Sequence, residues 1–153
     1  MFRHLRPMLC SLCLATMLLA AHAAAAENPA NPLVTDRGLF RPLIIVAPSA
    51  ADPDFRRMRE RLATRQAAFD QREMLLYTIA GDYGERAGKP MTDAEVSALL
   101  EAMDVDTQGP TTVILVGKDG GKKMQLEGFV PPQQVFDIID RMPMRRRESG
   151  QRS

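Results

Sequence analysis

The stretch LIIVAPSAADPDF, residues 43–55, decides the fold that the sequence predicts. Its first five residues form a continuous apolar run, as expected of a strand buried on both faces of a sheet. Pro48 ends the run. Asp52 followed by Pro53 is typical of a helix that begins with a capping carboxylate and a proline at its first position. A buried strand that leads directly into a helix indicates the start of a βαβ unit.

The rest of the chain supplies the remaining elements of one domain over residues 40–143. Apolar residues at helical spacing predict helices, and short apolar runs between turn residues predict strands. In chain order we expect a helix through residues 55–69, a strand over 74–79, a glycine-rich loop over 80–90, a helix opened by a capping box at Thr92 and Glu95, a strand over 111–116, a hairpin turn at Asp119 and Gly120, a strand over 122–127 and a helix after Pro131 and Pro132.

The resulting order is β-α-β-α-β-β-α, an α/β arrangement. The first half is a parallel βαβ unit, which is right-handed in nearly all known cases. The second half is a hairpin followed by a helix. This is the order of the thioredoxin fold, and it predicts a mixed four-stranded sheet flanked by helices.

The amino-terminal 26 residues have the three parts of a secretory signal. Arg3 and Arg6 form a basic start, residues 8–21 form a mainly apolar segment, and small residues follow up to Ala26. The apolar segment is shorter than the roughly 20 residues that a membrane-spanning helix needs. We therefore expect residues 1–26 to be cleaved near Ala26. The exported remainder, periplasmic or secreted, is expected to hold no transmembrane anchor.

All cysteines and histidines of the chain lie inside this predicted signal. Cys10 and Cys13 have the C-x-x-C spacing of thiol–disulfide enzymes and many zinc sites, and His4 and His22 are the two histidines. Residues 27–153 therefore contain no thiol and no imidazole. This excludes dithiol oxidoreductases, cysteine and Ser-His-Asp hydrolases and Cys/His zinc proteins. We expect no cofactor and no metal, and the missing groups argue against an enzyme.

The charge balance of residues 27–153 limits the possible partners, and the composition of both ends predicts segments outside the domain. The chain has 20 basic and 19 acidic residues, and loss of the signal arginines leaves a slightly acidic remainder, which argues against nucleic acid as a partner. Residues 27–39, rich in Asn and Pro, predict a leader or linker. Residues 144–153 include Arg145, Arg146 and Arg147 and predict a basic, disordered tail. Such a tail can make weak contact with an anionic surface.

The segment GPTTVILV, residues 109–116, followed by Lys118-Asp119-Gly120, resembles the second half of thioredoxins. In that family a proline, usually cis, precedes a hydrophobic strand and a short hairpin. The redox pair of thioredoxins stands just after the first strand. Here that segment is residues 47–53, APSAADP, which holds no cysteine. The resemblance implies a thioredoxin-like domain without its nucleophile.

Three segments together resemble a narrower family, the DUDES-type domain of unknown function. They are RPL through APSA over residues 41–50, LVGKDGG over residues 115–121 and IDRMPMR over residues 139–145. Bacterial members of this family are small exported proteins, and animal members are modules of extracellular-matrix proteins. The family is regarded as thioredoxin-like or peroxiredoxin-like without the redox cysteines. The resemblance transfers no catalytic residue.

The segment that replaces the redox pair defines a candidate surface of Ser49, Asp52 and Pro110. Ser49 acts as a nucleophile only with a base beside it, and the remainder offers only lysines for that role. Asp52 and Asp54 could pair as general acid and base, but a helix start explains both through capping and the helix dipole. Two titratable groups within hydrogen-bond reach near Ser49 would favour an enzyme.

Two further motifs indicate turns rather than ligand sites. Residues 117–123, GKDGGKK, lack the four-residue glycine spacing and the following hydroxyl of a phosphate loop, and a hairpin turn explains them. Residues 104–109, DVDTQG, resemble the start of a calcium loop. The twelfth position of such a loop would be Leu115, which supplies no carboxylate.

The sequence thus predicts an exported, redox-inactive, thioredoxin-like domain that binds an unidentified protein partner in the cell envelope without catalysis. One alternative is an enzyme that uses carboxylate or serine chemistry in the degenerate site. Another is a stress protein whose basic tail binds anionic surfaces.

Overall fold

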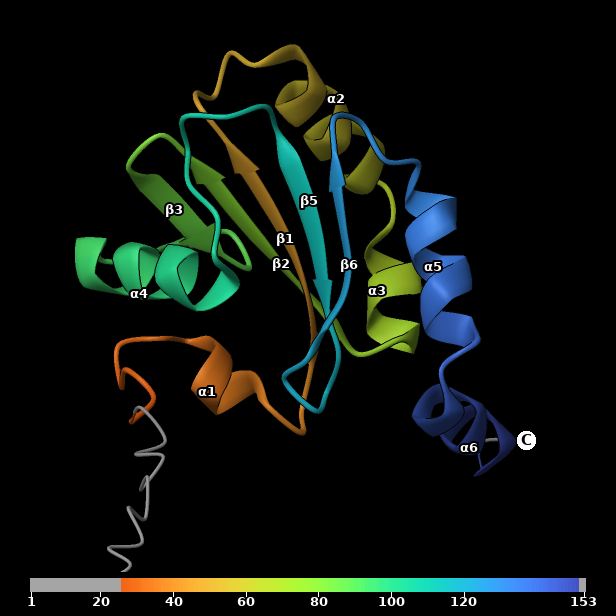
Figure 1. Ribbon diagram of the computed structural model, residues 1–153. Coiled ribbons are helices and arrows are strands. Elements are labelled where there is room, and N and C mark those ends of the chain that lie inside the picture. Colours follow the sequence, from red (N-terminus) through yellow and green to blue (C-terminus); the bar gives the residue numbers. More distant parts are fainter. Residues whose placement is uncertain (1–25, 152–153) are drawn as a thin grey trace, which may run out of the picture.

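The computed structural model describes residues 26–151. Six strands form one sheet in the order β4-β3-β2-β1-β5-β6, with helices on both faces (Figure 1). The strands are β1 (Arg41–Ala47), β2 (Met74–Ala80), β3 (Tyr83–Arg86), β4 (Lys89–Pro90), β5 (Thr112–Val116) and β6 (Lys122–Glu127). The helices are α1 (Leu33–Asp36), α2 (Pro53–Leu62), α3 (Gln66–Gln71), α4 (Asp93–Met103), α5 (Pro132–Asp140) and α6 (Pro143–Gln151).

The four strands at the centre and one side of the sheet have the predicted arrangement. β1 runs parallel to β2 and antiparallel to β5, and β5 pairs antiparallel with β6. All seven residues of β1 and all five of β5 are buried, as their continuous apolar runs predict. The α/β class and the thioredoxin-like order of these four strands are confirmed.

The sheet has six strands rather than the predicted four. The glycine-rich segment expected to be a loop forms β3 and β4, which extend the sheet beyond β2. Gly81 and Gly88 adopt φ angles of 65° and 75° in the two turns, a region that glycine enters at low cost. The prediction was wrong because these strands are too short to show the alternation of apolar and polar residues that indicates a strand. β3 is held by pairing with β2, and β4 by pairing with β3.

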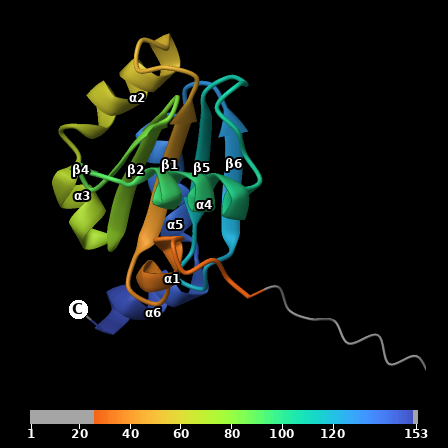
Figure 2. The ribbon, with the colours of Figure 1, turned by 90° about the vertical axis from the view of Figure 1, so that its left-hand side faces the viewer.

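The helices divide the core into two layers. α2, α3 and α5 cover one face of the sheet, and α4 and α1 cover the other (Figure 2). The first layer buries Phe55, Met58 and Leu62 of α2, as the helical spacing predicts. The second layer buries Val96 and Leu99 of α4. Apolar burial of this kind contributes about 25 cal/mol for each Å² removed from water.

Both ends of the domain are more ordered than the sequence predicts. The leader contains α1, whose Leu33 and Asp36 are buried against the sheet. The expected disordered tail instead forms α6, which begins at Pro143. Proline ends a preceding helix but also suits the first turn of a new one, where its missing N–H needs no partner.

The predicted signal, with Cys10, Cys13, His4 and His22, lies outside the described residues, apart from Ala26. Across the described part of the chain, every helix is too short or too polar to cross a lipid bilayer.

Candidate functional site

The amino terminus of α2 follows β1, at the position where the resemblance to thioredoxins implies the degenerate site. Asp52 caps this helix, and its Oδ1 accepts hydrogen bonds of 3.0 Å from the backbone N–H groups of Asp54 and Phe55. The hydroxyl of Thr111 donates a third bond to the same oxygen, at 2.6 Å. These donors, Thr111 first, lower the pKa of Asp52 below its ordinary value. Asp52 is therefore an ionised structural anchor.

The bond from Thr111 brings the predicted surface together, because Pro110 precedes Thr111 in the chain. Ser49 and Pro110 are both exposed. Ser49 contributes its carbonyl oxygen, which accepts a 3.2 Å bond from the backbone N–H of Asp52. No peptide bond between described residues is cis, so Pro110 follows a trans bond, unlike the proline usual in thioredoxins. Thr111 is the partner that sequence reasoning missed.

A hollow of about 620 Å³ opens beside this surface, at the carboxyl ends of β1 and β2. We call it the carboxyl-edge hollow. It lies between the loops after these strands, the first turns of α4 and the loop before β5. The polar side chains in its wall are Asp82, Asp93, Ser97, Thr107 and Gln108.

The position of this hollow follows a general rule of open α/β sheets. Ligands bind outside the carboxyl ends of the strands, at the point where the chain connections diverge. Asp82 follows β2 by two residues, so its place after a buried strand was the sequence signal that could have found it. Asp93 is the first residue of α4, next to the predicted cap Thr92. The wall offers carboxylate, hydroxyl and amide groups to a ligand.

The hydrogen bonds that the Asp52 carboxylate accepts do not join it to a second titratable side chain. The hydrogen bonds to Asp52 come from a hydroxyl and two backbone amides, none of which exchanges protons near neutral pH. Within residues 26–151, no group of three His, Cys, Asp or Glu side chains is placed to hold a metal ion. The arrangement can recognise a ligand by charge and hydrogen bonding.

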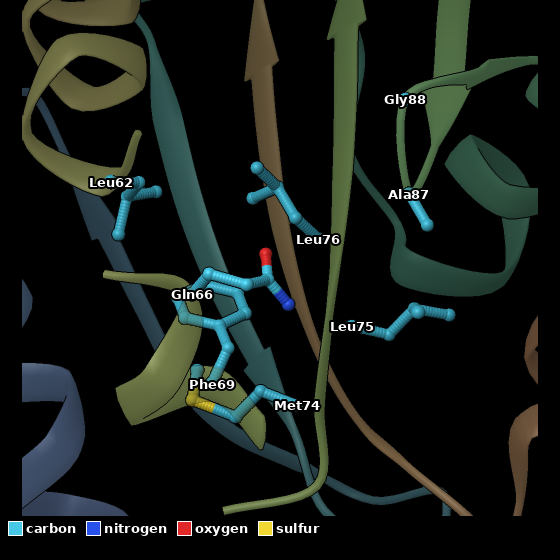
Figure 3. Close-up of a pocket in the computed structure, with 8 residues that line it drawn as sticks. All are labelled: Leu62, Gln66, Phe69, Met74, Leu75, Leu76, Ala87 and Gly88. Atoms are coloured by element: carbon cyan, nitrogen blue, oxygen red, sulfur yellow. The ribbon is translucent and has the colours of Figure 1, made fainter. Parts of the chain in front are cut away.

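A second hollow, of about 380 Å³, lies between α2, α3, β2 and the β3–β4 turn. Figure 3 shows its side chains, which are mostly apolar, with the amide of Gln66 between Leu76 and Met74. That amide donates a 2.8 Å hydrogen bond to Asp70 on the same helix. The hollow has no other polar side chain in its wall and offers no reactive group.

A buried polar cluster joins the leader to the sheet on the α4 side. Asp36, 1% exposed, accepts a 2.5 Å hydrogen bond from the hydroxyl of Tyr77 and an ion pair from Arg86. The guanidinium Nε of Arg86 also donates to the Tyr77 hydroxyl at 3.0 Å. Burial and the neighbouring carboxylate raise the pKa of Tyr77. Each of these three side chains has a hydrogen-bond or ion-pair partner within the cluster, so the cluster stabilises the fold.

Comparison with known proteins places the chain in a family but gives it no activity. A search of curated proteins and a search of solved structures found no match. A family model described as a domain of unknown function, DUF4174, matches residues 32–148. This span covers most of the described chain, from α1 to Glu148 in α6. The chain belongs to the DUF4174 family of domains of unknown function.

Proposed function

We propose that this protein is an exported, redox-inactive binding module that holds a protein partner at its carboxyl-edge surface. The surface consists of Ser49, Asp52 and Pro110 together with the polar wall of the carboxyl-edge hollow. The carrying observation is that Asp52, which caps the helix after β1, is bonded to Thr111 in the loop before β5.

Two features of the surface support binding without chemistry. The position next to the first strand holds an ionised cap instead of a nucleophile. The adjoining hollow presents Asp82 and Asp93, both without an ion pair among the described residues. Two carboxylates without an ion pair among the described residues favour a partner that brings positive charge or hydrogen-bond donors. We therefore expect a basic segment of the partner to enter the hollow.

Export is supported by the amino-terminal sequence. The basic start, apolar segment and alanine-rich end over residues 1–26 favour cleavage near Ala26. The resemblance to DUDES-type proteins, whose bacterial members are exported, favours the same conclusion. Mass spectrometry of protein recovered from the envelope fraction should give a chain that begins at or near Glu27. A chain that retains Met1 in the cytoplasmic fraction would refute export.

The binding proposal is tested with an affinity-tagged protein that captures partners from envelope extract. The double variant Asp82→Asn, Asp93→Asn removes the charge of the hollow and keeps the side-chain shape. The matched control Glu60→Gln, Asp137→Asn removes the same charge from exposed positions on α2 and α5. We expect a saturable partner that the wild type and the control retain and the hollow variant loses at least about fivefold. Equal capture by all three proteins would refute the proposal.

A further inference from the structure

A buried arginine lies at the amino end of β1, at the opposite end of the sheet from the surface described above. Arg41 is 1% exposed, and its Nη1 donates a 2.9 Å hydrogen bond to the carbonyl oxygen of Arg72. Its Nη2 donates to both carboxylate oxygens of Glu148, at 3.1 Å each. A guanidinium buried to this degree needs a carboxylate partner, since an unpaired buried charge is costly.

A lysine completes the cluster. The ammonium group of Lys118, on a side chain that is 11% exposed, donates to Glu148 at 2.9 Å and also pairs with Glu73. Glu73 lies 3.6 Å from Arg41 as well. Two cations thus share two carboxylates, and the cluster is neutral only when Glu148 is in place.

Glu148 comes from a helix that is weakly attached elsewhere. No residue of α6 is buried, and its other link of opposite charge is from Arg145 to Asp140, at 3.6 Å. Figure 1 shows α6 below α5, apart from the body of the sheet. The ion pairs of Glu148 are therefore the main attachment of α6 to the sheet.

A hollow of about 350 Å³ opens directly beside the cluster. Its wall includes the cations Arg41, Lys118 and Lys123 and the apolar side chains of Met142, Pro143 and Met144. Lys123 is paired with Asp119, whereas Arg41 and Lys118 share the carboxylates of Glu73 and Glu148. We call this hollow the tail hollow. It combines a cationic end with a hydrocarbon wall.

We propose that the tail hollow binds an aliphatic carboxylate, which replaces Glu148 on Arg41 and Lys118 and releases the part of α6 that follows Met144, so that Pro143 and Met144 stay in the wall. The carboxylate head takes the hydrogen bonds that Glu148 now accepts, and the hydrocarbon part packs on Met142, Pro143 and Met144. The buried charge of Arg41 is neutralised in both states. Glu148 is then an intramolecular competitor that weakens the binding of the external ligand.

The release of α6 has a direct readout, because Arg145, Arg146 and Arg147 are cleavage sites for trypsin. Docked helices are cut slowly, and released segments are cut faster. The protein, expressed from the full chain, is titrated with hexanoate or with its uncharged analogue hexanamide. We expect hexanoate, and not hexanamide, to raise the cleavage rate at residues 145–147, as measured by mass spectrometry.

Two variants separate competition at the cluster from general loosening of the helix. Glu148→Gln removes the competing charge, so hexanoate should bind at least about fivefold more tightly than to wild type in calorimetry. The double variant Lys118→Met, Glu148→Gln should bind hexanoate more weakly than the single variant Glu148→Gln. Glu60→Gln on α2 is the matched control and should behave as wild type.

A free aliphatic acid and an acidic protein side chain share this carboxylate chemistry, so N-acetylglutamate amide serves as a third probe. Tighter binding of hexanoate indicates a free acid, and tighter binding of the glutamate derivative indicates a protein side chain. The proposal is overturned if neither probe binds the Glu148→Gln protein, or if hexanamide binds as tightly as hexanoate.

Discussion

The hydroxyl of Thr111 donates a 2.6 Å hydrogen bond to the carboxylate of Asp52, which lies 59 positions earlier in the chain. The same carboxylate oxygen caps the first turn of α2. This bond ties the loop before β5 to the start of α2. It therefore fixes the shape of the surface that carries Ser49 and Pro110.

Replacement of Asp52 by Ala should destabilise the protein by about 2–3 kcal/mol. The helix loses its cap, worth about 1 kcal/mol, and the buried hydroxyl of Thr111 loses its acceptor, at about 1–2 kcal/mol. Thr111→Val keeps the side-chain shape and should cost about 1 kcal/mol. Urea denaturation of both single variants and the double variant gives the coupling energy. Strict additivity of the two costs would contradict a direct bond between these residues.

Replacement of Tyr77 by Phe should cost about 1–3 kcal/mol, because Asp36 loses a hydrogen-bond donor inside the fold. The ring still fills its place, so the loss reports on the hydroxyl alone. Thermal or urea denaturation measures it. Tyr83→Phe is the control, because Tyr83 is exposed and its hydroxyl donates a hydrogen bond to Glu85 at the surface. The two variants should differ clearly, and equal stability would contradict a structural role for the buried cluster.

Replacement of Gly84 by Ala should destabilise the protein by about 1–3 kcal/mol through overpacking. A Cβ atom built on Gly84 would lie 2.6 Å from Cγ2 of Val96, so β3 and α4 would have to move apart. Gly109→Ala is the control, since nothing lies within 4 Å of its added Cβ. Denaturant unfolding compares the two variants. A harmless Gly84→Ala change would show that β3 does not pack on α4 as described.

The stabilising effect of Glu148 should disappear in acid. Burial alone would raise the pKa of Glu148, but hydrogen bonds and charges from Arg41 and Lys118 outweigh it and lower the pKa below the ordinary 4.5. The unfolded chain therefore takes up the proton first, and the contribution of Glu148 is present above pH 4.5 and is lost as the pH falls through the lowered pKa. Denaturant unfolding should show wild type more stable than Glu148→Gln by about 1–3 kcal/mol at pH 7. The gap should narrow towards pH 3, and a constant gap would contradict the ion pairs.

Local signals predicted much of this fold. The cap at Asp52, the capping box of Thr92 and Glu95 and the hairpin turn at Gly120 are all present. Each of these features depends on residues close in sequence, so each can be predicted from the sequence alone. The order of the elements also predicted that the segment with Ser49 and Asp52 joins the first buried strand to a helix.

Distant partners account for what the sequence did not predict. Thr111, Asp82 and Asp93 join the site through loops that meet only when the sheet forms. β3 and β4 are too short to show a periodic pattern of apolar residues; β3 depends on pairing with β2, and β4 on pairing with β3. Residues 144–153 were predicted as a disordered tail because they are rich in arginine.

The sequence by itself determined the α/β class of this protein, the starts of α2, α4 and α5 and the absence of cysteine and histidine from residues 27–153. These features depend on composition and on contacts along a few residues of chain. Only the tertiary structure decided where Asp36 and Arg41 lie, both charged and both 1% exposed. A charge can be buried only beside a partner that neutralises it, and the partners, Arg86 and Glu148, are 50 and 107 positions away.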